Sequence, residues 1–487
     1  MRLAFKNLPL GWICVCVALF VVSMSCFPIQ SEDLFMYLAI AREFFKDHVF
    51  PAQDPFLYSI PHYSWTIFHQ WLGYLAYYGL YVLGGFPLII LAKTFLITAT
   101  FCVPVLKIKA SREAVFFWGL SVLLAVFAMS FRMMERTSLF SDFLAVAVLT
   151  ILLRGQENLS TPWKYALPGI FALWVNLHPG FPVGWLLYGG FLLVNLKSEA
   201  RAEYRKWAAL VLASVLVCFL NPKGVEGFLY PFQFASHEGK VFREYYFEWM
   251  PTLHPLYRTQ PPIYFIFALI AVNVFLLYRA RKTRPFFELG ASVFFIFYGL
   301  YAIRFVPSLC FALVSLNAAL ALKADLAAFP FLRRRALGAL GVVALALAVK
   351  NVFWGYETLA GPREFGLGMD PRLVPEKAAS LLKDSGLPGN IYNSHLFGGY
   401  LAWAWEGKPK IIYHGFLTDT DFFLREYRGF SMNRERFDLQ VDKYGIGAFL
   451  LDRFRGNEEL LEILVRHPRW QLVYKDEGSL IFLRKRE

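Results

Sequence analysis

Charged residues are scarce in this 487-residue chain, since Asp, Glu, Lys and Arg make up only 17% of it while hydrophobic residues make up 57%. A soluble domain of ordinary composition carries about 25% charged residues. The deficit excludes an ordinary soluble enzyme, and the apolar excess excludes a disordered or fibrous chain. The 18% of aromatic residues is typical of a protein that faces lipid and the lipid–water interface.

Several well-known motifs are also missing. The sequence has no HExxH, P-loop, GxGxxG or GxSxG element in a fitting context, which argues against ATP-driven transport, a Rossmann-type nucleotide site and serine hydrolase chemistry. The six cysteines all lie in apolar stretches, and none follows Cys310. They therefore form neither a disulfide framework nor a zinc-ligand pattern.

The chain changes character near residue 355. Apolar runs of membrane-spanning length recur up to that point, whereas residues 356–487 alternate charged and apolar stretches. We therefore predict a polytopic α-helical membrane domain over residues 1–355 and a small α/β domain over residues 356–487. In the second domain the patterns predict helices over 372–385, 433–443 and 457–465, and strands over 409–413, 447–451, 470–474 and 479–483.

The distribution of Lys and Arg predicts the sidedness of the membrane domain. Residues 66–84 are apolar but crowded with aromatic residues, and they include His69. If this segment lies along the interface, the N-terminus and the most basic loops all fall on one side, as the positive-inside rule requires. We therefore predict eleven spans, of which 8–29 is the first, and a cytoplasmic N-terminus. The net charge of +13 is then a signal of topology and not of nucleic-acid binding.

On this topology the outer, periplasmic side holds the loops 30–85, 131–137 and 221–260 together with the α/β domain. The first loop opens with Glu32 and Asp33, directly before an amphipathic stretch. A carboxylate at the membrane surface can accept a proton from a hydroxyl nucleophile as a general base. Alternatively, the two acids only stabilise the positive end of the following helix.

A lysine lies deep in the second predicted span. Lys93 lies about two turns inside the apolar run 86–106, and an ammonium group in hydrocarbon is costly unless it faces a partner or a water-filled cavity. There it would meet a phosphate group. The alternative is a lysine that snorkels to the membrane surface.

Two arginines lie four residues apart in the second outer loop. Arg132 and Arg136 have the spacing to bracket an anionic group. Asp142 follows about one turn into the next span, where an unpaired carboxylate is expensive. The alternative is a structural Arg–Asp pair. Further polar candidates for the outer side are weaker one by one, since a lone histidine is more often structural than a ligand: His69, Glu135, His178, Glu248 and Arg304.

With these residues in view, the chain resembles the GT-C superfamily of integral-membrane glycosyltransferases, and within it a bacterial group. The resemblance covers nearly the whole chain and rests on the order of its motifs. These are Ser31-Glu32-Asp33-Leu34-Phe35, Asp54-Pro55-Phe56-Leu57-Tyr58, Trp65 to Gly85, Arg136-Thr137-Ser138-Leu139-Phe140, Asn176-Leu177-His178-Pro179-Gly180, Leu220-Asn221-Pro222, Glu248-Trp249, Arg304-Phe305-Val306-Pro307, Gly398-Gly399-Tyr400-Leu401 and Tyr444-Gly445 to Leu450-Leu451.

The resemblance implies a helical bundle with juxtamembrane helices in the first periplasmic loop, and an enzyme. Its donor is a sugar linked to polyprenyl phosphate, and the acceptor is a glycan, lipid or protein. Carried over by position, Asp33 matches the catalytic acid, with Glu32 as its neighbour. Lys93 resembles a basic residue near the donor phosphate. Asp142 sits like the acid after the third span of the protein-mannosyl and aminoarabinose transferases, although members of this chain's own group often lack it.

On this basis we expect Asp33 to deprotonate the acceptor while Lys93, Arg132, Arg136 and Arg304 stabilise the leaving lipid phosphate. No cofactor is required, and a divalent cation such as Mg²⁺ or Mn²⁺ is compatible with the acids of the site. The resemblance places the protein in a bacterial inner membrane. The alternatives are a non-catalytic membrane scaffold, a lipid-linked glycan transporter or a polymerase. A transporter would tend to show inverted repeats, which the sequence does not.

Overall fold

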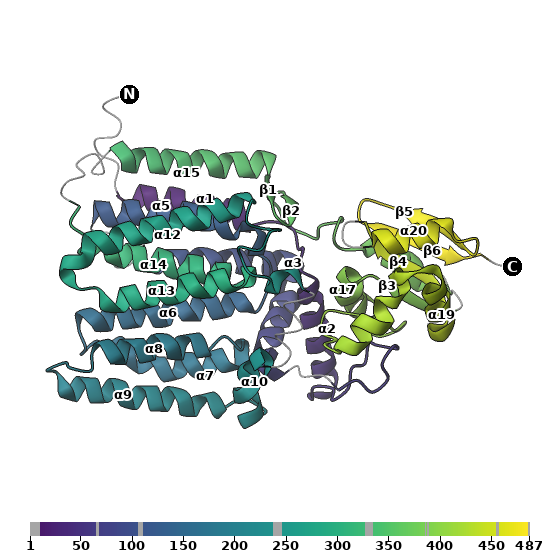
Figure 1. Cartoon of the computed structure of the whole chain (residues 1–487), viewed down its shortest axis with the longest axis horizontal. Coiled ribbons are helices and arrows are strands. Elements are labelled where there is room, and N and C mark those ends of the chain that lie inside the picture. Colours follow the sequence, from purple (N-terminus) through teal and green to yellow (C-terminus); the bar gives the residue numbers. More distant parts are fainter. Residues whose placement is uncertain are drawn as a thin grey trace. The chain divides into compact units, whose positions relative to one another are not determined.

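The computed structural model is mostly helical (Figure 1). It describes residues 10–64, 68–105, 111–236, 246–326, 335–384, 386, 389–453 and 457–485. Trp65 and the start of the predicted interfacial helix lie outside these residues, as do parts of the basic loops and of the third outer loop.

The chain divides into two compact units. The first, the bundle unit, comprises Met1–Phe27, Phe68–Gly73 and Ile90–Leu367. The second, the mixed unit, comprises Pro28–Ile67, Tyr74–Ile89 and Gly368–Glu487. The mixed unit therefore joins most of the predicted first outer loop to the C-terminal residues in one body. The predicted boundary at residue 355 divides a membrane domain from an α/β domain outside the membrane, which is a different division from that between the two compact units. It stays a prediction.

Long apolar helices make up the bundle unit and lie side by side (Figure 1). They are α1 (Leu10–Ser25), α5 (Arg112–Met129), α6 (Ser138–Glu157), α7 (Leu167–Leu177), α8 (Pro182–Val194), α9 (Arg201–Leu216), α12 (Pro261–Ala280), α13 (Phe286–Tyr301), α14 (Val306–Lys323) and α15 (Arg335–Trp354). The helix α14 is buried along most of its length, because it packs against α5, α6, α12 and α13. A short helix, α10 (Val225–Ser236), and a hairpin of β1 (Tyr356–Thr358) with β2 (Gly361–Arg363) complete this unit.

Six helices among the described residues are long and apolar enough to cross a membrane. They are Trp71–Cys102, Arg112–Arg132, Ser138–Glu157, Pro261–Thr283, Ile303–Lys323 and Arg335–Trp354, and shorter apolar helices occur at Leu10–Ser25, Pro182–Val194 and Phe286–Tyr301. These lengths and compositions agree with a multi-pass membrane protein. The count of eleven spans and the cytoplasmic N-terminus stay predictions.

The helix α3 (Trp71–Cys102) contains a break where the sequence predicted one helix to end and another to begin. Gly84 and Gly85 have non-helical backbone angles, and the φ of Gly85 is +64°, a value that glycine adopts without strain. The two halves of α3 therefore correspond to the predicted interfacial helix 66–84 and the second span. Whether the first half lies along the membrane surface stays a prediction.

The mixed unit contains a four-stranded sheet in the order β3-β4-β6-β5. The strand β3 (Asn390–Asn393) runs parallel to β4 (Ile446–Asp452), whereas β6 (Ser479–Arg484) is antiparallel to β4 and to β5 (Trp470–Lys475). The same unit contains α2 (Glu32–Asp47) from the first loop and the part of α3 over Tyr74–Ile89. Its other helices are α16 (Glu376–Asp384), α17 (His395–Trp405), a turn of π-helix η9 (Phe422–Tyr427), α18 (Gly429–Met432), α19 (Arg434–Tyr444) and α20 (Glu458–Arg466).

Most of the elements predicted in this region are confirmed. The helices α16, α19 and α20 and the strands β4, β5 and β6 all fall where their hydrophobic patterns place them. The predicted strand 409–413 is wrong, because this segment forms only an isolated bridge between Ile411 and Leu57. The strand β3 and the helix α17 were missed. The Gly398-Gly399 pair argues against a helix by propensity, but it permits close packing here.

Candidate functional site

Three arginines converge on one carboxylate in the bundle unit. Glu248, in the short helix η5 (Phe247–Trp249), accepts from Arg132 Nη1 at 2.5 Å and from Arg136 Nη1 at 3.1 Å, both on Oε2. Arg304 Nη1 lies 3.3 Å from the other oxygen, Oε1, and its guanidinium lies 3.8 Å from the centre of the Trp249 ring. We call Arg132, Arg136 and Arg304 the arginine group. The predicted anion between Arg132 and Arg136 is thus a carboxylate of the chain itself.

The arginine group keeps Glu248 ionised. Burial favours the neutral acid, but the guanidinium groups of Arg136, Arg132 and Arg304 outweigh it and hold the pKa of Glu248 well below its usual range. Three positive charges face this one negative charge. Asp142 is a further acid within electrostatic reach of Arg132.

Lys93 forms a salt bridge with Glu135 inside the bundle unit. The Nζ–Oε1 distance is 2.7 Å, and both side chains are fully buried. The ammonium group also lies 3.5 Å from the centre of the Phe27 ring. Arg363 stacks on the same ring at 4.0 Å and donates to the backbone oxygens of Ser130 and Phe131. The costly charge of Lys93 thus has the partner that its depth requires.

The remaining candidates of the bundle unit have local partners. Asp142 accepts a hydrogen bond from Ser308 Oγ at 2.5 Å and also interacts electrostatically with Arg132, so the alternative of a structural Arg–Asp pair stays open. The ring of His178 accepts the Gly180 N–H through Nδ1 at 3.1 Å. His69 stacks on Tyr230 with ring centres 4.1 Å apart. Each of these contacts fits a structural role as well as a functional one.

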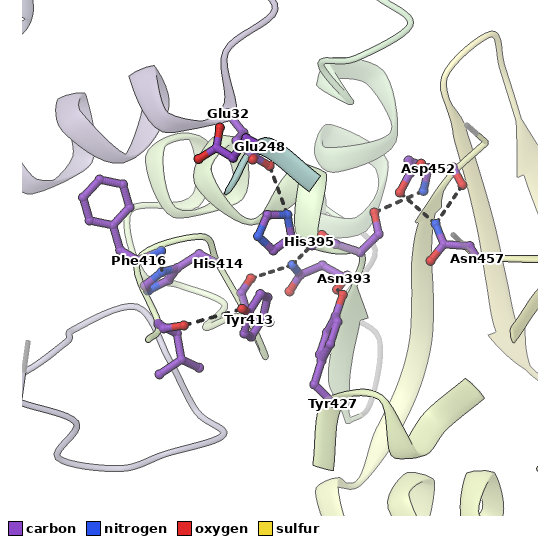
Figure 2. Close-up of polar contacts among 12 residues, drawn as sticks. Glu32, Glu248, Asn393, His395, Tyr413, His414, Phe416, Tyr427, Asp452 and Asn457 are labelled. Atoms are coloured by element: carbon purple, nitrogen blue, oxygen red, sulfur yellow. Dashed lines mark hydrogen bonds and ion pairs between the residues drawn. The ribbon is translucent and has the colours of Figure 1, made fainter. Parts of the chain in front are cut away.

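The two acids of the first loop open the helix α2 in the mixed unit. Ser31 occupies the N-cap without a side-chain cap bond, and Glu32 and Asp33 lie in the first turn. In that turn the two carboxylates interact favourably with the positive end of the helix dipole, as the alternative of a purely stabilising role expects. That role does not account for a further neighbour of Glu32. His395, the first residue of α17, places Nδ1 3.3 Å from Glu32 Oε2 (Figure 2).

Close packing of α17 against α2 brings His395 to the acids. A side chain at Gly399 would collide with the backbone oxygen of Glu32, and one at Gly398 would collide with that of Tyr413. Because both positions are glycine, α17 fits between the start of α2 and the segment 413–415. At Gly415, a Cβ atom would lie 3.6 Å from His395 Nε2 and 3.8 Å from Asp33 Oδ1.

A buried Asp–His pair ties the first loop to the same segment. The Asp54 Oδ1 atom accepts the N–H groups of Phe56 and Leu57, and Oδ2 lies 2.6 Å from His414 Nε2, with both side chains fully buried. His414 Nδ1 accepts the Phe416 N–H at 3.2 Å, so the ring proton is on Nε2 and is donated to Asp54. This pair holds the segment 414–416 in place beside Asp33.

We expect His414→Leu to destabilise the mixed unit by about 2 kcal/mol, because Oδ2 of the buried Asp54 carboxylate loses its hydrogen-bond donor while Oδ1 keeps the two backbone N–H groups. Thermal unfolding of the purified protein measures the effect. The control is His254→Leu, which removes a ring that accepts only one exposed backbone N–H. Equal unfolding temperatures for the two variants would contradict the importance of the Asp54–His414 pair.

Among the described residues, no group of three or more His, Cys, Asp or Glu side chains is placed to hold a metal ion. The candidates also divide between the two units. The arginine group, Glu248, Asp142, Lys93 and both His178 and His69 belong to the bundle unit, and Glu32 and Asp33 belong to the mixed unit. The sequence assigned no role in the site to His395, Asp54 or Arg363, whose partners are far away along the chain.

Comparison with known proteins identifies the fold. No protein-family model and no curated protein sequence matches the chain. Among solved structures it is similar to ArnT from Cupriavidus metallidurans bound to undecaprenyl phosphate, with 14% identity over 97% of each chain and a TM-score of 0.56, and equally to ArnT in the apo state. It is also similar to the archaeal oligosaccharyltransferase AglB from Archaeoglobus fulgidus, in complex with an inhibitory peptide and a dolichol-phosphate. There the identity is 13%, over 92% of this chain and 70% of that one, and the TM-score is 0.52.

Both proteins have the GT-C architecture, so the resemblance seen in the motifs is confirmed at the level of the fold. The chain has the fold of the GT-C membrane glycosyltransferases over nearly its full length.

Proposed function

We propose that this protein is a glycosyltransferase that moves a sugar from a polyprenyl-phosphate-linked donor to an extracytoplasmic acceptor. The observation that carries the proposal is the placement of Asp33 and Glu32 at the start of α2, in a fold whose solved relatives include ArnT bound to undecaprenyl phosphate. The acceptor is a glycan, a lipid or a protein. The proposed setting is a bacterial inner membrane, with eleven spans and the mixed unit on the periplasmic side.

The proposed reaction is a direct displacement. Asp33 takes the proton of an acceptor hydroxyl or amine while the acceptor atom forms a bond to the anomeric carbon. The bond from that carbon to the phosphate oxygen breaks, and the lipid phosphate leaves with the electron pair. Because attack and departure occur on opposite sides, the anomeric centre is inverted. No nucleotide takes part, which agrees with the missing nucleotide-binding motifs.

The arginine group is our proposed site for the donor phosphate. Negative charge grows on the leaving phosphate during the displacement, and preorganised guanidinium groups stabilise such charge more than the ground state. Glu248 orients the three arginines by accepting from all of them. Lys93 stays a proposed contributor, although its charge is already balanced by Glu135. Asp142, His178 and His69 are proposed supporting residues.

We expect Arg136→Met to lower kcat about 10²-fold, because one phosphate-stabilising donor is lost while Glu248 keeps two arginine partners. Sugar transfer in membranes from a polyprenyl-phosphate sugar measures the effect at matched protein amounts. The control is Arg258→Met, since Arg258 is exposed and lies in another predicted outer loop, 221–260. Unchanged kcat in Arg136→Met would remove this residue from the phosphate site.

A further inference from the structure

The arginine group already binds an oxyanion, which is a carboxylate of the chain. Glu248 Oε2 accepts from Arg132 at 2.5 Å and from Arg136 at 3.1 Å, and Arg304 Nη1 lies 3.3 Å from Oε1. Both carboxylate oxygens are therefore engaged, as the oxygens of any oxyanion bound by guanidinium groups would be. The Glu248 carboxylate thus marks a position among the three arginines that accommodates an anionic group.

This carboxylate is accessible from the surface of the bundle unit. The side chain of Glu248 is 29% exposed, and those of Arg304 and Arg136 are 22% and 16% exposed. Glu248 lies in the single helical turn η5, in which the preceding residue, Phe247, is 65% exposed. An anion that arrives from outside can therefore reach the arginines, and Glu248 can leave them by rotation about its own side-chain bonds.

The backbone around Glu248 has anchors of its own, so such a rotation leaves the segment in place. The Thr252 N–H donates to the backbone oxygen of Leu300 at 3.2 Å, and Tyr257 Oη donates to that of Phe247 at 2.8 Å. Neither hydrogen bond involves the Glu248 side chain. An exchange of the carboxylate for another anion therefore requires a change of rotamer and no refolding of the loop.

A phosphate can replace the carboxylate because it accepts more hydrogen bonds in more directions. Each of the three contacts to Glu248 runs through one Nη1 atom, whereas a guanidinium group carries five N–H donors. The tetrahedral oxygens of a phosphate fit guanidinium groups bidentately. Two anions at one position repel each other, and Asp142, within electrostatic reach of Arg132, adds to that repulsion. Exchange is therefore more favourable than joint occupancy.

We propose that the donor phosphate takes the position of the Glu248 carboxylate among the three arginines, and that Glu248 returns to this position when the lipid phosphate leaves. This inference rests on the proposed glycosyltransferase function. It makes Glu248 the residue that sets how tightly the phosphate site holds its ligand. In the absence of a donor, Glu248 keeps the three guanidinium groups together and so preorganises the site.

The exchange has its largest consequence after sugar transfer. The donor phosphate is a diester with one negative charge, whereas the released lipid phosphate is a monoester whose second pKa is about 6, so it carries more negative charge at neutral pH. Three arginines therefore hold the product more tightly than the donor, and slow release of product limits turnover in many enzymes. A carboxylate that competes for the same N–H groups weakens the hold on the product and speeds its release.

The test is the affinity of the purified full-length protein for a polyprenyl phosphate in detergent micelles, which requires no transfer activity. Glu248→Gln keeps the size of the side chain but removes its charge, so we expect the dissociation constant to be at least about 10-fold lower than in the wild type. If Glu248 only orients the arginines, the same variant should bind more weakly. In active membranes, added polyprenyl phosphate should likewise inhibit Glu248→Gln at a concentration at least about 10-fold lower.

The matched control is Glu226→Gln. Glu226 is an acid of the same predicted outer loop, its side chain is 62% exposed, and its salt-bridge partner is the exposed Lys223. Because it does not compete for the arginine group, its substitution should leave the dissociation constant unchanged. A decrease as large as that in Glu248→Gln would reduce the effect to the net charge of the outer face and overturn the exchange. The corresponding polyprenol, which lacks the phosphate, should bind equally to wild type and Glu248→Gln.

Thermal unfolding of the same proteins is a second measurement. Without ligand, Glu248→Gln should unfold at a lower temperature than the wild type, because three guanidinium groups lose their anion. Saturating polyprenyl phosphate should raise the unfolding temperature more in this variant than in the wild type, since it supplies the missing anion. An equal rise in both would overturn the exchange. If Glu248→Gln does not fold, Glu248→Asp replaces it, because its shorter carboxylate holds the arginines less well and should bind polyprenyl phosphate more tightly than the wild type does.

Failure of the exchange and failure of the proposed function give different results. If the wild type transfers sugar and Glu248→Gln binds polyprenyl phosphate no more tightly than the wild type does, only the exchange is overturned. If no donor supports transfer but Glu248→Gln binds polyprenyl phosphate more tightly, the exchange stands and the enzymatic function fails. Absence of binding in both proteins would overturn the phosphate site together with the exchange.

Discussion

Membranes that contain the Asp33→Asn variant should transfer sugar about 10³-fold more slowly than wild-type membranes, because an amide cannot take the proton of the acceptor. The substitution keeps the size of the side chain and its place in the first turn of α2. The measurement is incorporation of labelled sugar from a polyprenyl-phosphate donor, with the amount of protein matched by immunoblot.

The matched control is Asp47→Asn, which changes an exposed acid at the last position of the same helix and should leave transfer unchanged. Equal transfer by wild type and Asp33→Asn would remove Asp33 as the base. Absence of transfer from every donor, in wild type and variant alike, would instead favour a membrane scaffold with a GT-C fold.

The second large effect concerns the buried salt bridge of the bundle unit. Glu135→Leu should lower the stability of the folded protein by about 3–5 kcal/mol, because the Lys93 ammonium group is left in an apolar interior without its carboxylate. The double variant Lys93→Met/Glu135→Leu should recover most of this loss, since apolar residues of similar size replace both charges. Thermal unfolding in detergent micelles measures both.

The control for this experiment is Lys46→Met, which breaks the Lys46–Glu43 pair where the lysine is 47% exposed. Such a pair contributes less than about 1 kcal/mol. The double variant also tests the phosphate role of Lys93 apart from its structural role. If the stable double variant transfers sugar at the wild-type rate, Lys93 takes no part in binding the donor phosphate.

Local patterns account for the parts of the fold that were predicted. Apolar runs mark the apolar helices, and Gly84-Gly85 marks the break in α3, because glycine adopts the positive φ of Gly85 without strain. Short, mostly apolar runs bounded by polar residues mark β4, β5 and β6. The helix α17 was not predicted, because its two glycines are poor helix formers. Only the backbone of Tyr413 and of Glu32, which packs against them, explains why both positions are glycine.

For the candidate site, the sequence by itself determined which residues we propose for the chemistry. An acid at the exit of the first predicted span, a lysine inside the second predicted span and two arginines four residues apart can each be noticed one at a time, because a charge in or near hydrocarbon is costly. Only the tertiary structure decided their partners. Glu248 meets arginines from two other segments, Lys93 meets Glu135, and Glu32 meets His395.

The two residues of each pair are tens to hundreds of positions apart in the sequence. The attraction between opposite charges depends on their distance in space and not on their separation along the chain. Helical and strand periodicity describe only neighbours within a few residues. The sequence therefore determined that buried charges need partners, while the packing of the helices determined which partners they have.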